Sequence, residues 1–165
     1  MGSGPSGFTG VSAKTTEEAE ALFKRAIQTA DREQQDSEHK VRNIFISFHA
    51  DDEAQVQLLR AQAKREGTNL EFRDYSIKEP IEQWRTEVRE KIANTSATVV
   101  MIGPETANRP NVLYEIEQSY LQGKKVIGVR IYRDRNDPIP EPMLRNKAPI
   151  VNWDLKEIQA ELDKS

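Results

Sequence analysis

The sequence predicts an α/β fold in which a five-stranded parallel sheet, with strand order 2-1-3-4-5, carries helices on both faces. Short apolar runs, typical of strands buried on both sides, alternate with segments of helical periodicity. Alternating units of this kind form open parallel sheets with right-handed crossovers. The first apolar run is hydrophobic enough to lie at the centre of the sheet and the second is not, which favours the flavodoxin-like order.

Length and composition exclude several classes of protein. The chain has 165 residues, enough for one domain with a substantial core. It has no cysteine, which excludes disulfide scaffolds, thiolate catalysis and cysteine-bound metals, and is consistent with a cytoplasmic protein. The formal net charge of -3 disfavours nucleic acid as a partner, and we expect no secretory signal and no membrane span. Two histidines, His39 and His49, are too few and too scattered for a histidine metal site.

The N-terminal part of the chain differs from the rest. Residues 1–14 are rich in Gly, Ser and Pro, and we expect a disordered tail or a remnant of cloning. Residues 15–40 are expected to form an added helix and a linker, because Thr15 and Glu18 make a capping-box pattern before apolar residues at helical spacing. Two interpretations of this helix remain open. It packs on the domain's own surface, or it couples the domain to another copy or partner.

The remaining elements follow from Val41 onward. Pro80 suits the first turn of a helix, while Gly67 and Gly123 are typical of helix ends. The four prolines between residues 133 and 149 predict a loop. Strands are expected at residues 42–48, 70–73, 97–103, 126–131 and 150–153, and helices at residues 51–65, 80–92, 111–121 and 154–162.

Ligands of such sheets bind beyond the carboxyl ends of the strands. The residues expected there are 47–52, 74–76, 103–109 and those from Tyr132 onward. Several familiar sites are excluded: the chain has no phosphate-binding P-loop motif and no GxGxxG after the first strand. A phospho-receiver site is also excluded, because the third strand ends in Ile102 and Gly103, without an acceptor Asp, and Trp153 replaces the required Lys.

The residue that remains as a candidate is Glu115. It lies about one turn into the helix that begins near Pro110, so it can face the ligand crevice while Ile116 and Tyr120 face the sheet. Helix N-termini also favour an ionised carboxylate. The alternative is a solvated helix-face residue, and on the residues alone Glu117 competes equally for the role.

Four segments in order carry a resemblance to a known family. They are VRNIFISFH at residues 41–49, FRDYS at 72–76, IANTSATVVMIG at 92–103 and TANRPNVLYEI at 106–116. Together they resemble the TIR-like domains of bacteria, the family that includes the TIR component of Thoeris anti-phage systems. The resemblance runs from about residue 41 to 153, so residues 41–165 are taken as the TIR-like domain, with the N-terminal helix outside it.

The resemblance implies a function. Catalytic members of the family cleave NAD at the nicotinamide–ribose bond, and give ADP-ribose, cyclic isomers of it or related signals that activate an effector. NAD is then a substrate, no cofactor or metal is required, and the implied partners are further copies of the chain and a separate effector protein. The catalytic glutamate of the family lies in a Trp-Val-x-Tyr-Glu pattern. Here residues 111–115 read Asn-Val-Leu-Tyr-Glu, so Glu115 takes this role, with Asn111 in place of the Trp.

The chemistry suits a single carboxylate. Loss of nicotinamide leaves a ribosyl centre with oxocarbenium character, and a fixed carboxylate can stabilise the growing positive charge. The leaving group is a pyridinium, so no general acid has to protonate it. The residues expected to bind substrate are Ser47, Phe48, His49, Asp74, Ser76, Trp84, Arg109 and Tyr114.

Each supporting residue also has a structural interpretation. Phe48 and Trp84 suit the core, and His49 suits a surface loop. Asp74 and Ser76 are typical of turns. Solvated charges are the alternative for Arg109 and the expectation for Arg133 and Arg135.

Two further functions stay open. The first is a non-catalytic TIR-like module that assembles with partners through the N-terminal helix. The second is an enzyme similar to nucleoside deoxyribosyltransferases, which combine a similar fold with a carboxylate nucleophile.

Overall fold

The structure is a computed structural model that describes residues 15–74 and 81–164. The chain divides into two units, Met1–Lys40 and Val41–Ser165. The expectations for residues 1–14 and for Ser76 lie outside the described residues. No helix within the described part of the chain is both long enough and apolar enough to cross a membrane.

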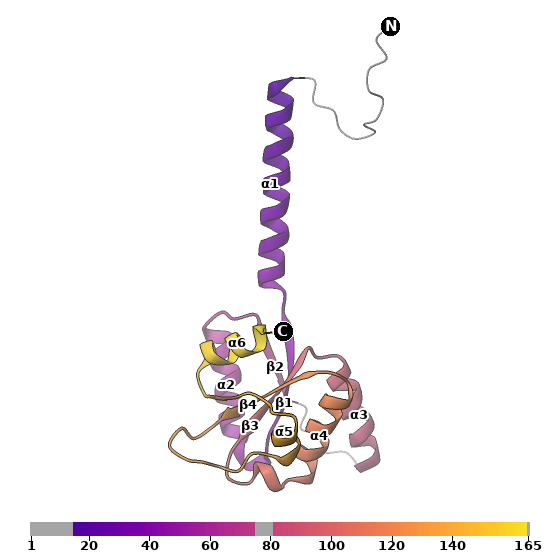
Figure 1. Cartoon of the computed structure of the whole chain (residues 1–165), viewed down its shortest axis with the longest axis vertical. Helices are drawn as coiled ribbons and strands as arrows, with labels where there is room; N and C mark the ends of the chain where they lie inside the picture. Colours follow the sequence, from indigo (N-terminus) through magenta and orange to yellow (C-terminus); the bar gives the residue numbers. More distant parts are fainter. Residues whose placement is uncertain (1–14, 75–80, 165) are drawn as a thin grey trace. The chain divides into compact units, whose positions relative to one another are not determined.

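The described part of the first unit is helix α1, Thr16–His39 (Figure 1). The hydroxyl of Thr15 accepts a hydrogen bond of 3.2 Å from the backbone N–H of Glu18, which satisfies one of the amides that a helix start leaves unpaired. Glu17 and Glu18 add negative charge to the first turn, where the helix dipole favours it. The predicted N-cap at Thr15 is therefore confirmed.

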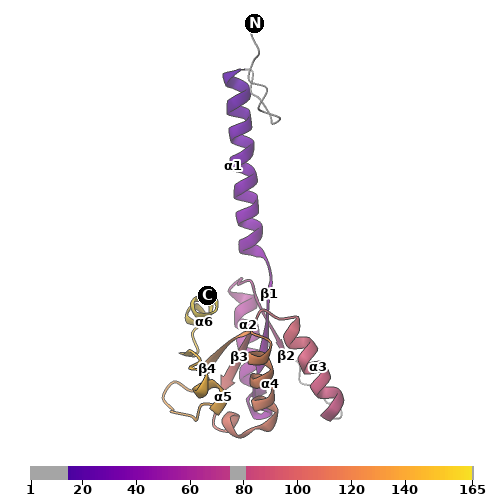
Figure 2. The ribbon, with the colours of Figure 1, turned by 45° about the vertical axis from the view of Figure 1, so that its right-hand side comes forward.

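The second unit is built on a five-stranded parallel sheet of order β2-β1-β3-β4-β5 (Figures 1 and 2). This confirms the predicted fold class and strand order. All six residues of β3 are buried, as a strand at the centre of a doubly covered sheet requires. The strands are β1 Arg42–Ser47, β2 Leu70–Asp74, β3 Ala97–Ile102, β4 Lys125–Arg130 and β5 Ile150–Asn152.

Helices cover both faces of this sheet. Apolar side chains of α2 and α6 share one core cluster with Ile44 and Ile46 of β1, while α3 packs on Phe45 from the other side. Helices α4 and α5 pack on Val100 and Ile102 of β3. The helices are α2 Glu53–Arg65, α3 Ile81–Ala93, α4 Pro110–Leu121, α5 Glu141–Arg145 and α6 Leu155–Asp163.

The alternation along β1 decides which face each side chain meets. Successive residues of a strand point to opposite faces, so Ser47 shares the face of Phe45 and not that of Ile46. That face is covered by α3 and α4. The last residue of β1 therefore points its hydroxyl towards the helix that carries Glu115.

The expectation of a continuous loop at residues 133–149 was wrong, because α5 forms inside it. Pro140 precedes the helix and Pro142 lies in its first turn, where a missing N–H costs nothing. Met143 then anchors the short helix in the core cluster of α4. Proline indicates a helix start as readily as a loop, and the buried Met143 decides between them here.

Candidate functional site

Glu115 contacts the end of the central strand β1. The Ser47 hydroxyl donates a hydrogen bond to Oε2 of Glu115. Ser47 is completely buried at the last position of β1, and Glu115 is half-buried on α4. The two residues stand 68 positions apart in the sequence. The fold therefore unites two residues that the sequence places at the ligand edge, and the carboxylate is not turned out to bulk solvent.

A buried network fixes the rotation of α4. The Ser119 hydroxyl donates to the backbone carbonyl of Glu115 over 2.8 Å, and lies 2.7 Å from the hydroxyl of Thr98 on β3. Both Ser119 and Thr98 are fully buried. Because these bonds tie the helix to the strand beneath it, the Glu115 backbone is held in one orientation towards β1.

An aromatic pair joins α3 to α4 at the residue before Glu115. The rings of Trp84 on α3 and Tyr114 on α4 are 5.2 Å apart at an angle of 45°, and the Arg85 guanidinium lies 5.2 Å from the centre of the Tyr114 ring. Both rings are half-buried and pack against Phe45 and its neighbours. Trp84 thus belongs to the core, as its spacing indicated, and also lies next to the residue that precedes Glu115.

The other residues after β1 point elsewhere. Phe48 is half-buried and packs on the core cluster of α2 and α6, so the structure does not bring it to Glu115. His49 is buried, not a surface loop residue, and its Nδ1 accepts from the backbone N–H of Asp51 over 3.1 Å. Its Nε2 lies 3.7 Å from the carboxylate of Asp51. His49 therefore organises the turn that follows the strand.

Asp52 is a buried carboxylate that the sequence did not single out as a site residue. It is 5% exposed, and a Cβ placed on Gly103 would come within 2.6 Å of its Oδ2. Burial raises the pKa of Asp52 above 3.8, the charge of His49 opposes this, and Asp51 and Asp137 add to it. Asp52 thus occupies the crevice between the ends of β1 and β3, where the strand order reverses. The signal that could have revealed it is the glycine at the end of the third strand.

The remaining predicted residues are only partly placed. The backbone of Asp74 pairs with Ile46, so it lies at the ligand edge of the sheet, but its side chain lies outside the description. Arg109 precedes α4, is 46% exposed and forms an ion pair with Glu105 at 3.8 Å. Glu117 pairs with Arg145, which directs this competitor of Glu115 towards α5.

The two arginines after β4 differ from each other. Arg135 is not a simple solvated charge, since it pairs with Asp137 at 3.3 Å and lies over the Tyr132 ring. Arg133 is exposed. Across the described residues, no group of three or more acidic or histidine side chains could hold a metal ion.

Comparisons with known proteins give a family and several similar folds. A family model described as "Thoeris protein ThsB, TIR-like domain" matches residues 45–136. The TIR domain of the Toll-related receptor TRR-2 from Hydra magnipapillata is 14% identical with a TM-score of 0.48, over 71% of this chain and 88% of that one. No curated protein matches.

Two further solved structures are similar at the same level. The CMP N-glycosidase BcmB of Clostridium botulinum is 16% identical with a TM-score of 0.47, over 74% of this chain and 98% of that one. The TIR domains of the activated Roq1 resistosome, which recognises the effector XopQ, are 18% identical with a TM-score of 0.41, over 54% of this chain and 57% of that one.

Proposed function

This chain belongs to the Thoeris ThsB family of TIR-like domains, and from this premise we propose that it cleaves NAD at the bond between nicotinamide and ribose. The observation that carries the proposal is the hydrogen bond from buried Ser47 to the carboxylate of Glu115 at the ligand edge of the sheet. The products would be ADP-ribose, cyclic ADP-ribose or a related nucleotide signal in anti-phage defence, read by a separate effector protein.

In the proposed reaction the bond between C1′ of the ribose and the ring nitrogen of nicotinamide breaks. Its electron pair goes to the ring nitrogen, so neutral nicotinamide leaves and C1′ gains oxocarbenium character. Water then attacks C1′ and releases a proton to give ADP-ribose, or a nitrogen of the adenine attacks to give a cyclic product. NAD is consumed as the substrate, and we propose no cofactor.

Glu115 would act on the charge that develops at C1′. An opposite charge about 4 Å away is worth about 4 kcal/mol at the effective dielectric constant of a partly exposed site. If the carboxylate exerts this attraction only in the transition state, it accelerates the reaction about a thousandfold. Glu115 therefore needs a fixed position close to C1′, and Ser47 supplies one of its contacts.

The supporting roles follow from position. Tyr114 and Trp84 would form an apolar wall that limits the access of water to the reacting centre. Asp74, the last residue of β2, and Ser76, two positions later in the sequence, would bind ribose hydroxyls, while Arg109 would meet the pyrophosphate. We also propose that the active form contains more than one copy of the chain.

The test is product analysis of the full chain incubated with NAD. We expect nicotinamide release by the wild type and about a thousandfold less by Glu115→Gln, which removes the charge and keeps the shape. Glu117→Gln is the matched control, because this carboxylate lies two residues further along the same helix but pairs with Arg145. The assay covers a range of protein concentrations, since a centre that requires two copies would be silent in a dilute sample.

Three outcomes contradict the proposal. Full activity in Glu115→Gln would remove the residue from the reaction. Base exchange on deoxynucleosides, with no cleavage of NAD, would identify a transferase that uses the same carboxylate. An absence of nicotinamide at every protein concentration would leave a binding module that assembles with partners.

A further inference from the structure

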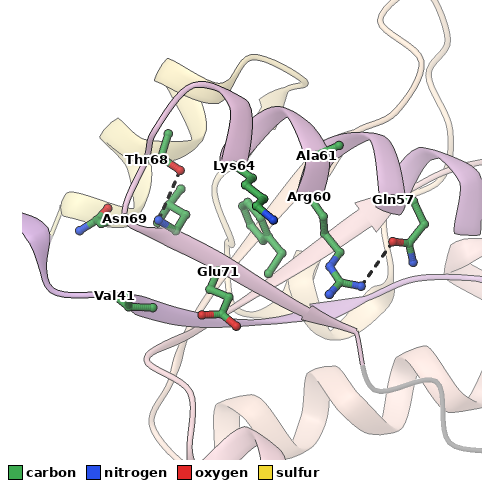
Figure 3. A pocket seen from close by; sticks show the side chains of 10 residues that line it. Val41, Gln57, Arg60, Ala61, Lys64, Thr68, Asn69 and Glu71 are labelled. Atoms are coloured by element: carbon green, nitrogen blue, oxygen red, sulfur yellow. Dashed lines mark hydrogen bonds between the residues drawn. The ribbon is translucent and has the colours of Figure 1, made fainter.

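A groove of about 580 Å³ lies between α2 and the edge strand β2 (Figure 3). Its wall on the helix consists of Gln57, Arg60, Ala61 and Lys64, and its remaining lining comes from residues 68–72 and Val41. None of these residues belongs to the site around Glu115. The groove therefore requires a separate explanation.

The groove carries two cations that have no acidic partner among residues 15–74 and 81–164. Arg60 and Lys64 lie one turn apart on α2, and Figure 3 shows both side chains extending towards β2. Within the described ranges neither forms an ion pair, and the Arg60 guanidinium donates a hydrogen bond of 3.4 Å to the neutral amide oxygen of Gln57. The carboxylate of Glu71, which also lines the groove, pairs with Arg73 at 3.3 Å.

Several arginines on other elements have carboxylate partners, as in the pairs Arg42–Asp163, Arg135–Asp137 and Arg145–Glu117. Two adjacent cations that lack such a partner leave a local excess of positive charge. A ligand that fits the groove should therefore be acidic.

The floor of the groove is the outer strand of the sheet. β2 pairs with β1 on one side, and no other described strand pairs with its outer edge. That edge presents backbone N–H and C=O groups to an incoming chain. Leu70 and Phe72 face α2 and are buried beneath it. Their apolar side chains are therefore already covered, and an added strand would bind through the backbone of the edge.

We propose that this groove binds an extended acidic segment of a partner protein, which adds to β2 as a further strand. The spacing supports this occupant. Residues four apart on a helix rise by about 6 Å, and alternate residues of a strand lie about 6.6 Å apart. Acidic side chains at alternate positions of the added strand would therefore meet Arg60 and Lys64 together. Main-chain bonds supply affinity and the two cations supply selectivity.

The test uses labelled synthetic peptides of about six residues and the full chain. The probe alternates Glu and Thr. One control peptide carries Lys in place of Glu, and a second keeps the glutamates but has Pro in place of the threonines, which removes the N–H groups that pair with an edge. Binding is measured by fluorescence anisotropy, and hydrogen exchange follows the backbone amides of residues 70–73.

Two charge-reversal variants are compared, one within the groove and one, the control, outside it. Arg60→Glu with Lys64→Glu should weaken binding of the acidic peptide roughly tenfold or more, because attraction becomes repulsion. Lys156→Glu on α6, where the described residues give the lysine no ion pair, should leave binding within about twofold. In the wild type the peptide should slow exchange of the β2 amides.

Other results would overturn the proposal. No binding of the Glu–Thr peptide at millimolar concentration would exclude an acidic strand. If the Pro peptide bound as tightly as the Glu–Thr peptide, or if hydrogen exchange of the β2 amides did not change, the peptide would be held by its charge alone and not as an added strand. Displacement of the peptide by free ADP-ribose at micromolar concentration would assign the groove to a nucleotide. These measurements need no NAD cleavage, so they stand apart from the function proposed above.

Discussion

Replacement of Ser47 by alanine would remove the contact between β1 and the candidate catalytic carboxylate. Ser47 is fully buried and its hydroxyl donates to Oε2 of Glu115. Alanine has nearly the same volume and suits a buried strand end, so the variant tests the hydrogen bond and not the packing. The structure therefore predicts a loss in both stability and activity from a change of one atom.

The magnitude follows from the charge of the acceptor. A hydrogen bond to an ionised group contributes about 1.5 to 3 kcal/mol. In a chain of this size each kcal/mol lowers Tm by about 2 to 4 °C, so Ser47→Ala should lower Tm by roughly 3 to 12 °C. If the bond also orients Glu115 in the transition state, kcat should fall about 10- to 150-fold while KM changes little.

A double-mutant cycle separates this bond from other effects of the substitution. The free energy of unfolding is measured by urea titration for Ser47→Ala, Glu115→Ala and the double variant. We expect a coupling energy of about 1.5 to 3 kcal/mol. A coupling energy below about 0.3 kcal/mol would refute the reasoning, because the two side chains would then act independently.

Three further predictions concern other parts of the chain. Gly128→Ala places a Cβ 2.6 Å from Cδ1 of Ile150 and 2.7 Å from Cδ1 of Ile102, and should cost about 1 to 3 kcal/mol in urea titration. Ile150→Val should recover part of this loss, and additive effects would argue against the clash with Ile150. Burial raises the pKa of Asp52 in the folded state, so the folded protein resists ionisation of this side chain. The free energy of unfolding therefore falls as the pH rises from 3.8, and it stops falling once the pH is above the folded-state pKa. Asp52→Asn should accordingly be more stable than wild type at pH 7 but not at pH 3, and parallel stability curves would contradict this. Thr15→Ala should weaken the start of α1 by about 1 kcal/mol, seen as faster hydrogen exchange at the Glu18 amide; unchanged exchange would show that the cap contributes nothing.

The architecture could be predicted because each strand is short, apolar and followed by a helical pattern. The order of strands followed from the contrast between β1, which is central, and β2, which lies at the edge. Met143 shows where this reasoning failed, since composition favoured a loop in the proline-rich stretch and a tertiary contact stabilised a helix there. Local signals cannot report a contact with a distant part of the core.

The site was predicted in a similar way. Glu115 and Ser47 could both be assigned to the ligand edge, because that assignment needs only strand ends and helix starts. The burial of Asp52 could not be anticipated, since it depends on the absence of a side chain at Gly103, 51 positions further along the chain. The pairing of Glu117 with Arg145 could not be predicted either, because Arg145 lies on α5 and the sequence pattern did not predict that helix.

The distance along the chain between Ser47 and Glu115 has a consequence for biosynthesis. Contacts between residues so far apart close late, because a long intervening segment must first be ordered. During translation Ser47 is added to the chain 68 residues before Glu115. The two groups meet once β3 and α4 have docked on β1. The contact between Ser47 and Glu115 would in this way form only when most of the domain has been synthesised.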